Sequence, residues 1–122
     1  MLYLGPISHD ESETFFKKCN IQFCESSGCV YCKDGNEILG FCLYDLDNEK
    51  MTVKYIEPIN DIALADGILR STLHVAAERS IMDTFYADTL PVDFLKKIGF
   101  IKNESEKRLD IDKLFKSCCG CN

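Results

Sequence analysis

Three apolar segments of strand length follow one another in the first half of the chain, separated by two turns. Asp34-Gly35 is a strong hairpin signal, and Asp47-Asn48-Glu49 forms a second turn. The segment between the two turns is apolar on both faces, as expected for a central strand. The pattern predicts an antiparallel meander of three strands, at residues 29–32, 37–46 and 50–57.

A helical pattern begins almost directly after this meander. An apolar, β-branched run stops at Pro58, and Asn60 and Asp61 can both cap a helix. Apolar residues then recur at helical spacing from Ile62 to Ala76, within a stretch that ends at Ile81. We therefore expect a strand that leads through a very short turn into a long amphipathic helix. Such a junction points unpaired backbone N–H groups beyond the end of the strand, which makes a natural anion site.

The flanking segments carry weaker patterns. Before residue 11 we expect only a turn, followed by a helix at residues 11–18 with Ser12 or Asp10 as its cap and an edge strand at residues 21–25. Residues 108–116 fit either a strand or a helix. After the long helix, the pattern predicts a strand, a helix ended by glycine, and a further strand, at residues 82–88, 92–98 and 100–101. The predicted fold class is α/β of the α+β type, a mixed and mostly antiparallel sheet flanked by helices.

Length and charge narrow the class of protein. A chain of 122 residues is expected to form a single domain, residues 1–122, with one core that needs no disulfide or metal. A net charge of −6 argues against nucleic acid and anionic membranes as partners. No apolar run is long enough to cross a bilayer, and the start lacks the basic region of a signal peptide. We expect a cytoplasmic protein with no nucleic-acid or membrane partner.

The eight cysteines raise the question of a metal site. Without an export signal, reduced thiols are expected. Four thiolates, the number that tetrahedral zinc needs, could come from Cys29-x-x-Cys32 together with the Cys-rich tail, residues 117–122. However, a strand would point Cys29 and Cys32 to opposite faces. We assign no metal ligand, and keep a thiol or metal function, or a disulfide, as an alternative for Cys118, Cys119 and Cys121.

The late segment Phe94-Leu-Lys-Lys-Ile-Gly-Phe100 and the order of the predicted elements are similar to those of the GNAT superfamily of acyl-CoA N-acyltransferases. Members typically carry a Phe-Tyr-x-Lys-Leu-Gly-Phe segment and a long helix with a Glu-Arg-Gly-Ile-like end. Here that helix finishes Ala77-Glu-Arg-Ser-Ile81. The resemblance covers residues 30–102. It implies a GNAT fold, acetyl-CoA as co-substrate, and transfer of the acetyl group to an unknown amine by direct attack.

The resemblance also implies a site for the pyrophosphate of coenzyme A. The family motif Arg/Gln-x-x-Gly-x-Gly/Ala falls on residues 60–65, where backbone N–H groups would approach phosphate oxygens at the start of the helix. Asp61 and Asp66 depart from what a phosphate site needs. Their carboxylates stabilise the helix through its dipole, but they also repel a pyrophosphate at the same place. The cofactor-binding residues implied are Ile56, Asn60, Ile62, Ala63, Leu64, Ala65, Lys96 and Lys97.

The catalytic residue implied by the resemblance is Glu57, in the region where the family often places a general base. The tyrosine that often protonates the leaving thiolate would fall at Leu95, which has no acidic group. Tyr55 and Tyr86 are alternative hydroxyl donors, with core packing the competing role for both. Residues 1–28 form a shorter N-terminal region than family members usually have. Three readings stay open: a small amine acceptor, a site completed within a homodimer, and a non-catalytic GNAT-like binding module.

Overall fold

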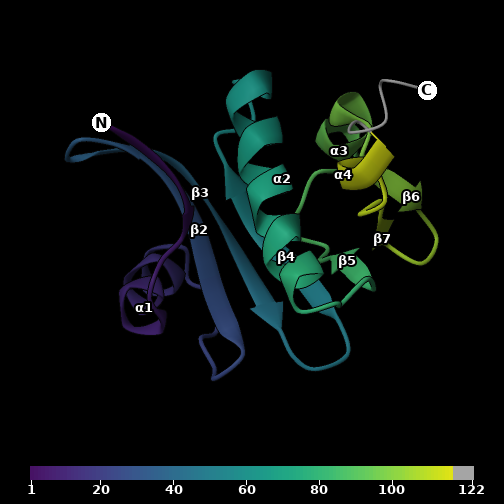
Figure 1. The fold of residues 1–122 in the computed structure, drawn as a ribbon, viewed down its shortest axis with the longest axis horizontal. Helices are drawn as coiled ribbons and strands as arrows, with labels where there is room; N and C mark the ends of the chain where they lie inside the picture. The colour runs from purple at the N-terminus through teal and green to yellow at the C-terminus, as the bar shows by residue number, and fades with distance from the viewer. Residues whose placement is uncertain (117–122) are drawn as a thin grey trace.

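The computed structural model describes residues 1–116 and places seven strands in one sheet (Figure 1). The strand order is β1-β2-β3-β4-β5-β7-β6, and β4–β5 is the parallel pair in an otherwise antiparallel sheet. In chain order the elements are β1 (Leu2–Pro6), α1 (His9–Lys18), β2 (Ser27–Asp34), β3 (Glu37–Leu46), β4 (Met51–Glu57), α2 (Ile62–Glu78), β5 (Thr84–Tyr86), α3 (Val92–Ile98), β6 (Ile101–Asn103), β7 (Arg108–Leu109) and α4 (Lys113–Lys116).

The predicted fold class and the three-stranded meander are confirmed, since β2, β3 and β4 pair antiparallel in sequence order. The helix predicted at residues 92–98 is also present, and Gly99 ends it in the left-handed conformation at φ 75°. Residues 108–116, which fitted either element, contain both β7 and α4. The long helix ends at Glu78, three residues before Ile81, because the Arg79 and Ser80 N–H groups already bond back to its last carbonyls.

The N-terminal predictions need correction. Leu2–Pro6, predicted only to contain a turn, is the edge strand β1 and pairs with β2. The predicted strand at residues 21–25 is absent, because local bonds hold its backbone: Ile21 N–H donates to Phe16 O at 3.0 Å and Cys24 N–H to Ser27 Oγ at 2.9 Å. The cap of α1 is Ser8, not Ser12 or Asp10, and its hydroxyl accepts from Glu11 N–H at 3.1 Å.

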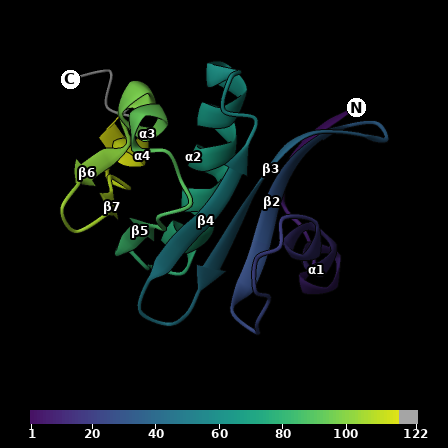
Figure 2. The same ribbon diagram turned by 180° about the vertical axis from the view of Figure 1, so that it is seen from behind.

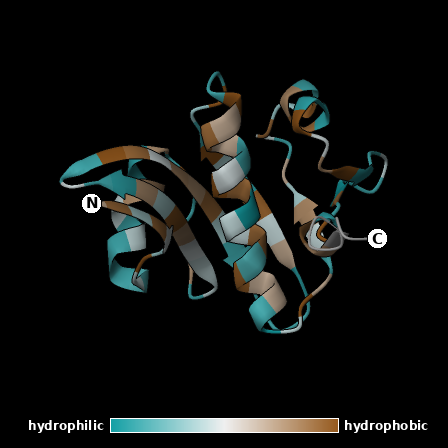
Figure 3. Ribbon diagram, turned by 45° about the horizontal axis from the view of Figure 1, so that its top comes forward, coloured by the Kyte–Doolittle hydropathy of each residue, from teal (hydrophilic) through white to brown (hydrophobic). Residues whose placement is uncertain are grey.

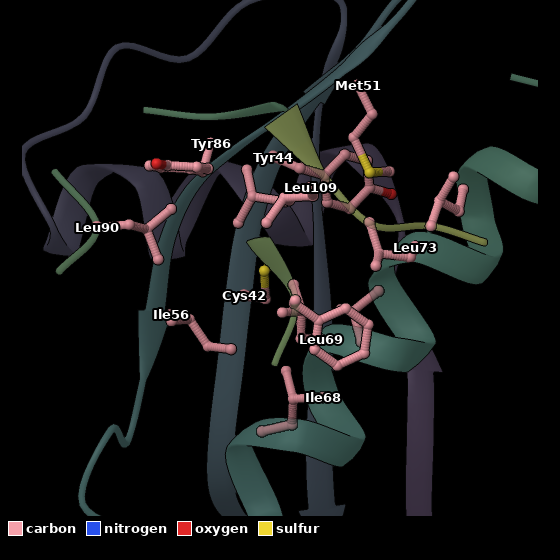
Figure 4. Packing of buried hydrophobic residues seen from close by; sticks show 14 of the residues in the cluster. Cys42, Tyr44, Met51, Ile56, Ile68, Leu69, Leu73, Tyr86, Leu90 and Leu109 are labelled. Atoms are coloured by element: carbon pink, nitrogen blue, oxygen red, sulfur yellow. The ribbon is translucent and has the colours of Figure 1, made fainter. Parts of the chain in front are cut away.

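Two apolar clusters lie on opposite faces of the sheet. The larger cluster lies between the sheet and α2, whose apolar and polar bands are visible in Figure 3. In the close view of Figure 4, Ile68, Leu69 and Leu73 of α2 meet strand residues such as Cys42 and Ile56. The smaller cluster lies under α1 and contains Phe16, Cys29, Phe41 and Leu43. Burial on both faces explains why β3 is apolar over residues 40–44.

A β-bulge at Lys54 changes which side chains of β4 face each cluster. Leu43 of β3 pairs with Tyr55, whereas the next residue of β3 pairs with Val53, so Lys54 has no partner in β3. As a result Val53 and Ile56, three residues apart, both reach the cluster under α2. Tyr55 packs against the cluster under α1 instead. The bulge thus directs the last residues of β4.

The parallel pair β4–β5 is short and then separates. The two strands pair only over residues 51–53 and 84–86, as the rear view shows (Figure 2). Beyond this point the Ala87 N–H still donates to Val53 O at 2.9 Å, and the Thr89 hydroxyl donates to Lys54 O. The end of β4 therefore lacks a neighbouring strand on its β5 side within the described residues.

No helix within residues 1–116 is long and apolar enough to cross a membrane.

Candidate active site

A cleft occupies the place where β4 and β5 separate. It has a volume of about 390 Å³. Its lining comes from the end of β4 and from the segment that joins β5 to α3: Tyr55, Ile56, Glu57, Ile59, Asp88, Thr89, Leu90 and Pro91. Ile56 and Leu90 are buried and give the cleft an apolar wall. The predicted catalytic residue, Glu57, is half-buried and lines this open cleft.

Tyr55 and Glu57 form a hydrogen-bonded pair inside this cleft. They are two residues apart on a strand, so their side chains share a face, and the Tyr55 hydroxyl donates to Glu57 Oε1 at 2.7 Å. This bond to a carboxylate, with some burial, raises the pKa of Tyr55 to about 12. Tyr55 also packs on Phe41, with ring centroids 5.8 Å apart. The phenol is held in place from both sides.

The remaining polar side chains of the cleft are engaged elsewhere. Asp88 is ion-paired with Lys107, and the hydroxyl of Thr89 donates to the backbone carbonyl of Lys54. Cys19, at the end of α1, lies close enough to Glu57 that burial together with this carboxylate raises the pKa of its thiol. The sequence pattern missed Cys19, Asp88 and Thr89, because only the tertiary fold brings them to Glu57.

The start of α2, the implied phosphate site, is capped by the chain itself. Asp61 is the N-cap residue, and its carboxylate accepts a hydrogen bond from Leu64 N–H at 3.2 Å. The Asp61 carbonyl accepts from Ala65 N–H at 2.9 Å. The N–H groups of Ile62 and Ala63 belong to the first turn, where an α-helix provides no internal acceptor. These two N–H groups are the donors that the turn can offer to an anion.

The other implied cofactor-binding residues fall into two environments. Asn60, Ile62 and Ala63 are exposed at the beginning of α2. Ala65 and Ile56 are buried and belong to the larger core cluster, against which Leu64 also packs. Asn60, Ile62 and Ala63 are therefore accessible to a ligand at the surface. Ala65 and Leu64 could contribute only through their backbone.

Asp66 is directed along α2 and away from its N-terminus. Its carboxylate accepts from Arg70 Nε at 2.9 Å, an i,i+4 ion pair in which both side chains are about one-third exposed. The Arg70 guanidinium lies 5.2 Å from the centre of the Phe100 ring. Since its charge is paired, Asp66 opposes an anion at the start of α2 less than Asp61 does.

The two lysines of α3 differ in their surroundings. Lys96 forms an ion pair with Glu104 at 2.9 Å, which raises the pKa of the lysine. Lys97 lines a second cavity of about 240 Å³, which lies between the starts of α2 and α3. Its lining residues are Ile59, Ile62, Pro91, Asp93, Phe94 and Lys97, and it shares Ile59 and Pro91 with the first cleft. A connected surface therefore runs from Glu57 to the N-terminus of α2, with Lys97 beside it.

The late helix α3 has leucine, not tyrosine, at the position where the family often places its acid. Leu95 of α3 is fully buried in the larger core cluster. Tyr86, one of the two alternative donors, is 3% exposed and lies next to Leu90 (Figure 4). Its hydroxyl has no hydrogen-bond partner within residues 1–116 and is not part of the cleft lining. Of the two alternatives, only Tyr55 lies in the cleft.

The two cysteines of β2 cannot bind one metal ion together. Cys29 belongs to the cluster under α1 and Cys32 to the cluster on the α2 face, as predicted for positions of opposite parity on a strand. Residues 1–116 contain no group of three or more His, Cys, Asp or Glu side chains arranged to hold a metal. Cys118, Cys119 and Cys121 lie outside the described residues.

Known proteins match this chain in fold. No protein-family model matches the sequence, and no curated relative does. Among solved structures, ribosomal-protein-alanine N-acetyltransferase from Brucella melitensis biovar Abortus 2308 superposes with a TM-score of 0.57 at 13% identity, covering 80% of this chain and 88% of that one. An acetyltransferase of the GNAT family from Desulfovibrio desulfuricans gives a TM-score of 0.58 at 12% identity, with coverage of 84% and 87%.

A third neighbour is Ard1 from Thermoplasma volcanium, with a TM-score of 0.53 at 11% identity and coverage of 88% of this chain and 92% of that one. At these identities the likeness concerns the fold. The chain has the GNAT fold, and the resemblance seen in the sequence is confirmed at that level. The first two of these neighbours are named as acetyltransferases.

Proposed function

We propose that this chain is an acetyl-CoA-dependent N-acetyltransferase that transfers the acetyl group to an amine by direct attack. The observation that carries the proposal is the carboxylate of Glu57 at the separation of β4 and β5, in a chain with the GNAT fold. A carboxylate in a cavity, beside an apolar wall, is suited to remove a proton from an attacking amine.

The cleft also has the charge that an amine acceptor would favour. Its lining contains the carboxylates of Glu57 and Asp88 and no basic residue. A negative cleft raises the local concentration of ammonium groups, which must lose a proton before they can attack. Lys107 offsets part of the charge of Asp88. Glu57 is then the carboxylate available to accept the proton.

The connected surface from Glu57 to α2 fits an elongated acyl carrier. Acetyl-CoA, when bound, supplies the acetyl group as a thioester. Ile56 and Leu90 would contact the acyl end, and Ile59 and Pro91 the part that joins the two cavities. The N–H groups of Ile62 and Ala63 would bind phosphate oxygens at the positive end of α2, and Lys97 would add a positive charge.

A second function is favoured by one observation, the cap of α2. The Asp61 carboxylate occupies the first-turn donor of Leu64, and its charge opposes a pyrophosphate. A chain that no longer binds acetyl-CoA would keep this cap. It would act as a non-catalytic GNAT-like module that works through protein contact or homodimer formation and not through turnover. Ligand binding separates the two functions.

The test is an assay of thiol release from acetyl-CoA with a panel of amines: short peptides with free N-termini, polyamines and aminoglycosides. At least one amine should stimulate release. The Glu57→Gln variant should lose about 10²-fold or more of that rate, the scale of general base catalysis, while still binding acetyl-CoA. Glu37→Gln, at the exposed start of β3, is the matched control and should keep full activity. Binding without release by any amine would favour the non-catalytic module.

A further inference from the structure

Direct transfer to an amine requires two proton movements, and the cleft must provide for both. The nitrogen loses one proton as the new C–N bond forms, and the sulfur gains one as the C–S bond breaks. Glu57 accounts for the first. A thiolate leaves more readily when the sulfur is protonated as the C–S bond breaks, so an acid in the cleft would speed the second proton movement.

The contacts within the cleft leave one side chain for this role. The Thr89 hydroxyl proton is committed to Lys54 O. Asp88 is paired with Lys107. The third hydroxyl-bearing residue nearby, Tyr86, is buried outside the lining. The Tyr55 phenol lines the cleft and already donates a hydrogen bond to Glu57 at 2.7 Å.

We propose that Tyr55 is the acid of this site and that it acts with Glu57 as one acid–base pair. The inference rests on the proposed acetyltransferase function and adds a residue to it. Tyr55 and Glu57 are two residues apart on β4, so their side chains share one face of the strand, and the bulge at Lys54 just before them sets which face this is. A phenol on the strand thereby replaces the acid that cannot exist at Leu95.

The proton balance closes within the pair. Glu57 takes the proton from the amine, and Tyr55 gives its phenolic proton to the sulfur. The proton on Glu57 then passes across the 2.7 Å hydrogen bond to the Tyr55 oxygen. Both side chains return to their starting states, the amide and the free thiol leave, and no further reactant is needed. A phenol is protonated at neutral pH even at its ordinary pKa of 10.0, so the donor is present at the start of each cycle.

The experiment compares two acetyl donors that differ in their need for an acid. One is an alkyl thioester, S-acetyl-N-acetylcysteamine, and the other is an aryl thioester, S-acetyl-4-nitrothiophenol, whose thiolate leaves unprotonated. Tyr55→Phe should lower the enzymatic rate with the alkyl donor by about 10²-fold and with the aryl donor by less than about threefold. Glu57→Gln should lower the rate with both donors, because both reactions need the base. Tyr86→Phe, which removes a hydroxyl from the same fold outside the cleft, should change neither.

A second readout does not depend on turnover. In protein labelled with ¹³C at tyrosine Cζ, the Tyr55 signal should titrate with a midpoint near pH 12. In Glu57→Gln the midpoint should fall toward the ordinary value of 10.0, because the carboxylate that raises the pKa is gone. Tyr44, whose pKa burial raises to about 12, is an internal reference that should not move.

The outcomes separate the two proposals. A wild-type protein that uses neither thioester nor acetyl-CoA with any amine overturns the proposed function. If the wild type is active but Tyr55→Phe lowers the rates with both donors equally, or lowers neither rate, only the role of Tyr55 is overturned. An unchanged Tyr55 titration in Glu57→Gln overturns the coupling of the pair, even where the variant is inactive.

Discussion

The Asp61 carboxylate accepts a hydrogen bond from the Leu64 backbone N–H at 3.2 Å, at the first turn of α2. In the proposed complex a pyrophosphate oxygen would approach this same turn. The chain therefore satisfies with its own side chain a donor that an anionic ligand would otherwise use. The cap stabilises α2 by roughly 0.5–2 kcal/mol and weakens the anion site through its charge.

Replacing Asp61 by Asn should strengthen coenzyme A binding without unfolding the helix. Asn caps a helix about as well as Asp, so the free energy of unfolding should change by less than about 0.5 kcal/mol. Loss of the negative charge should lower the dissociation constant for coenzyme A about three- to tenfold at low salt, and less at high salt. Calorimetry at two salt concentrations measures both effects.

Asp10→Asn is the control for this change, because Asp10 is an acidic residue in the first turn of another helix, α1, and does not line either cavity of the site. It should leave coenzyme A affinity unchanged. An equal gain from both substitutions would show that only net charge matters, and that the start of α2 is not the phosphate site.

The two lysines of α3 should contribute unequally to ligand binding. Lys97 lines the cavity at the start of α2, whereas Lys96 is paired with Glu104 at 2.9 Å. Lys97→Met should weaken coenzyme A binding several-fold and reduce its salt dependence, because one cation near the phosphates is lost. Lys96→Met should change the affinity by less than about twofold. The opposite ranking in calorimetric titrations would place the phosphates on the other side of α3.

Two glycines provide a matched test of how closely β3 approaches the site. A Cβ on Gly40 would lie 2.6 Å from Glu57 O and 2.8 Å from Pro58 Cδ, so Gly40→Ala must push the end of β4 away. We expect a loss of about 1–3 kcal/mol of stability, as for overpacked cores, and a displaced Glu57. In α2, a Cβ on Gly67 would meet only Leu4 Cδ2 at 3.9 Å, so Gly67→Ala should gain about 0.5–1 kcal/mol. Urea denaturation measures both, and a stable Gly40→Ala protein would contradict the packing described for β3.

Stability should fall on the alkaline side because buried thiols resist ionisation. Burial raises the pKa of Cys42 from 9.0 to about 12. Below pH 9 both the folded and the unfolded states hold this proton, so the thiol contributes no pH dependence. Between these two values the unfolded state loses the proton and the folded state keeps it, which favours unfolding by up to about 1.4 kcal/mol per pH unit. Burial of Cys29 raises its thiol pKa too and acts in the same direction.

Urea denaturation between pH 8 and 11 measures this slope, with Cys42→Ala as the test and Cys24→Ala as the control. Cys42→Ala should be less stable at pH 8 yet lose less stability as the pH rises. Cys24 is exposed, and neighbouring serine hydroxyls lower its thiol pKa, so its removal should not flatten the slope. Equal slopes in the wild type and Cys42→Ala would show that the Cys42 thiol ionises freely in the folded protein.

The sequence predicted those features of the fold that depend on local patterns. The central strand Glu37–Leu46 was predictable to the residue, since two turns bound it and both faces are apolar. Gly99 marked the end of α3, because a left-handed residue strongly favours glycine. The edge strand β1 was missed because its residues Leu2, Tyr3 and Leu4 are largely exposed and show no alternation. Its pairing with β2 decides the structure there.

The site was predictable only in part, for a similar reason. Glu57 and the α2 junction could be located because they follow one another in sequence. The pairing of Tyr55 with Glu57 agrees with their spacing of two, yet the bulge at Lys54 that orients them leaves no mark in the sequence. The ion pair of Lys96 with Glu104 depends on where the β6–β7 turn lies in space. Such contacts could be found only from the fold.

Calorimetric titration of the wild-type protein with acetyl-CoA tests the proposed function most directly. We expect saturable 1:1 binding with a dissociation constant between about 1 μM and 1 mM, the range usual for enzyme substrates. NMR signals of Glu57, Ile62 and Ala63 should shift on binding, because these residues lie along the connected surface. No heat and no shifts at millimolar acetyl-CoA would contradict the acetyltransferase proposal and leave a GNAT fold used for another purpose.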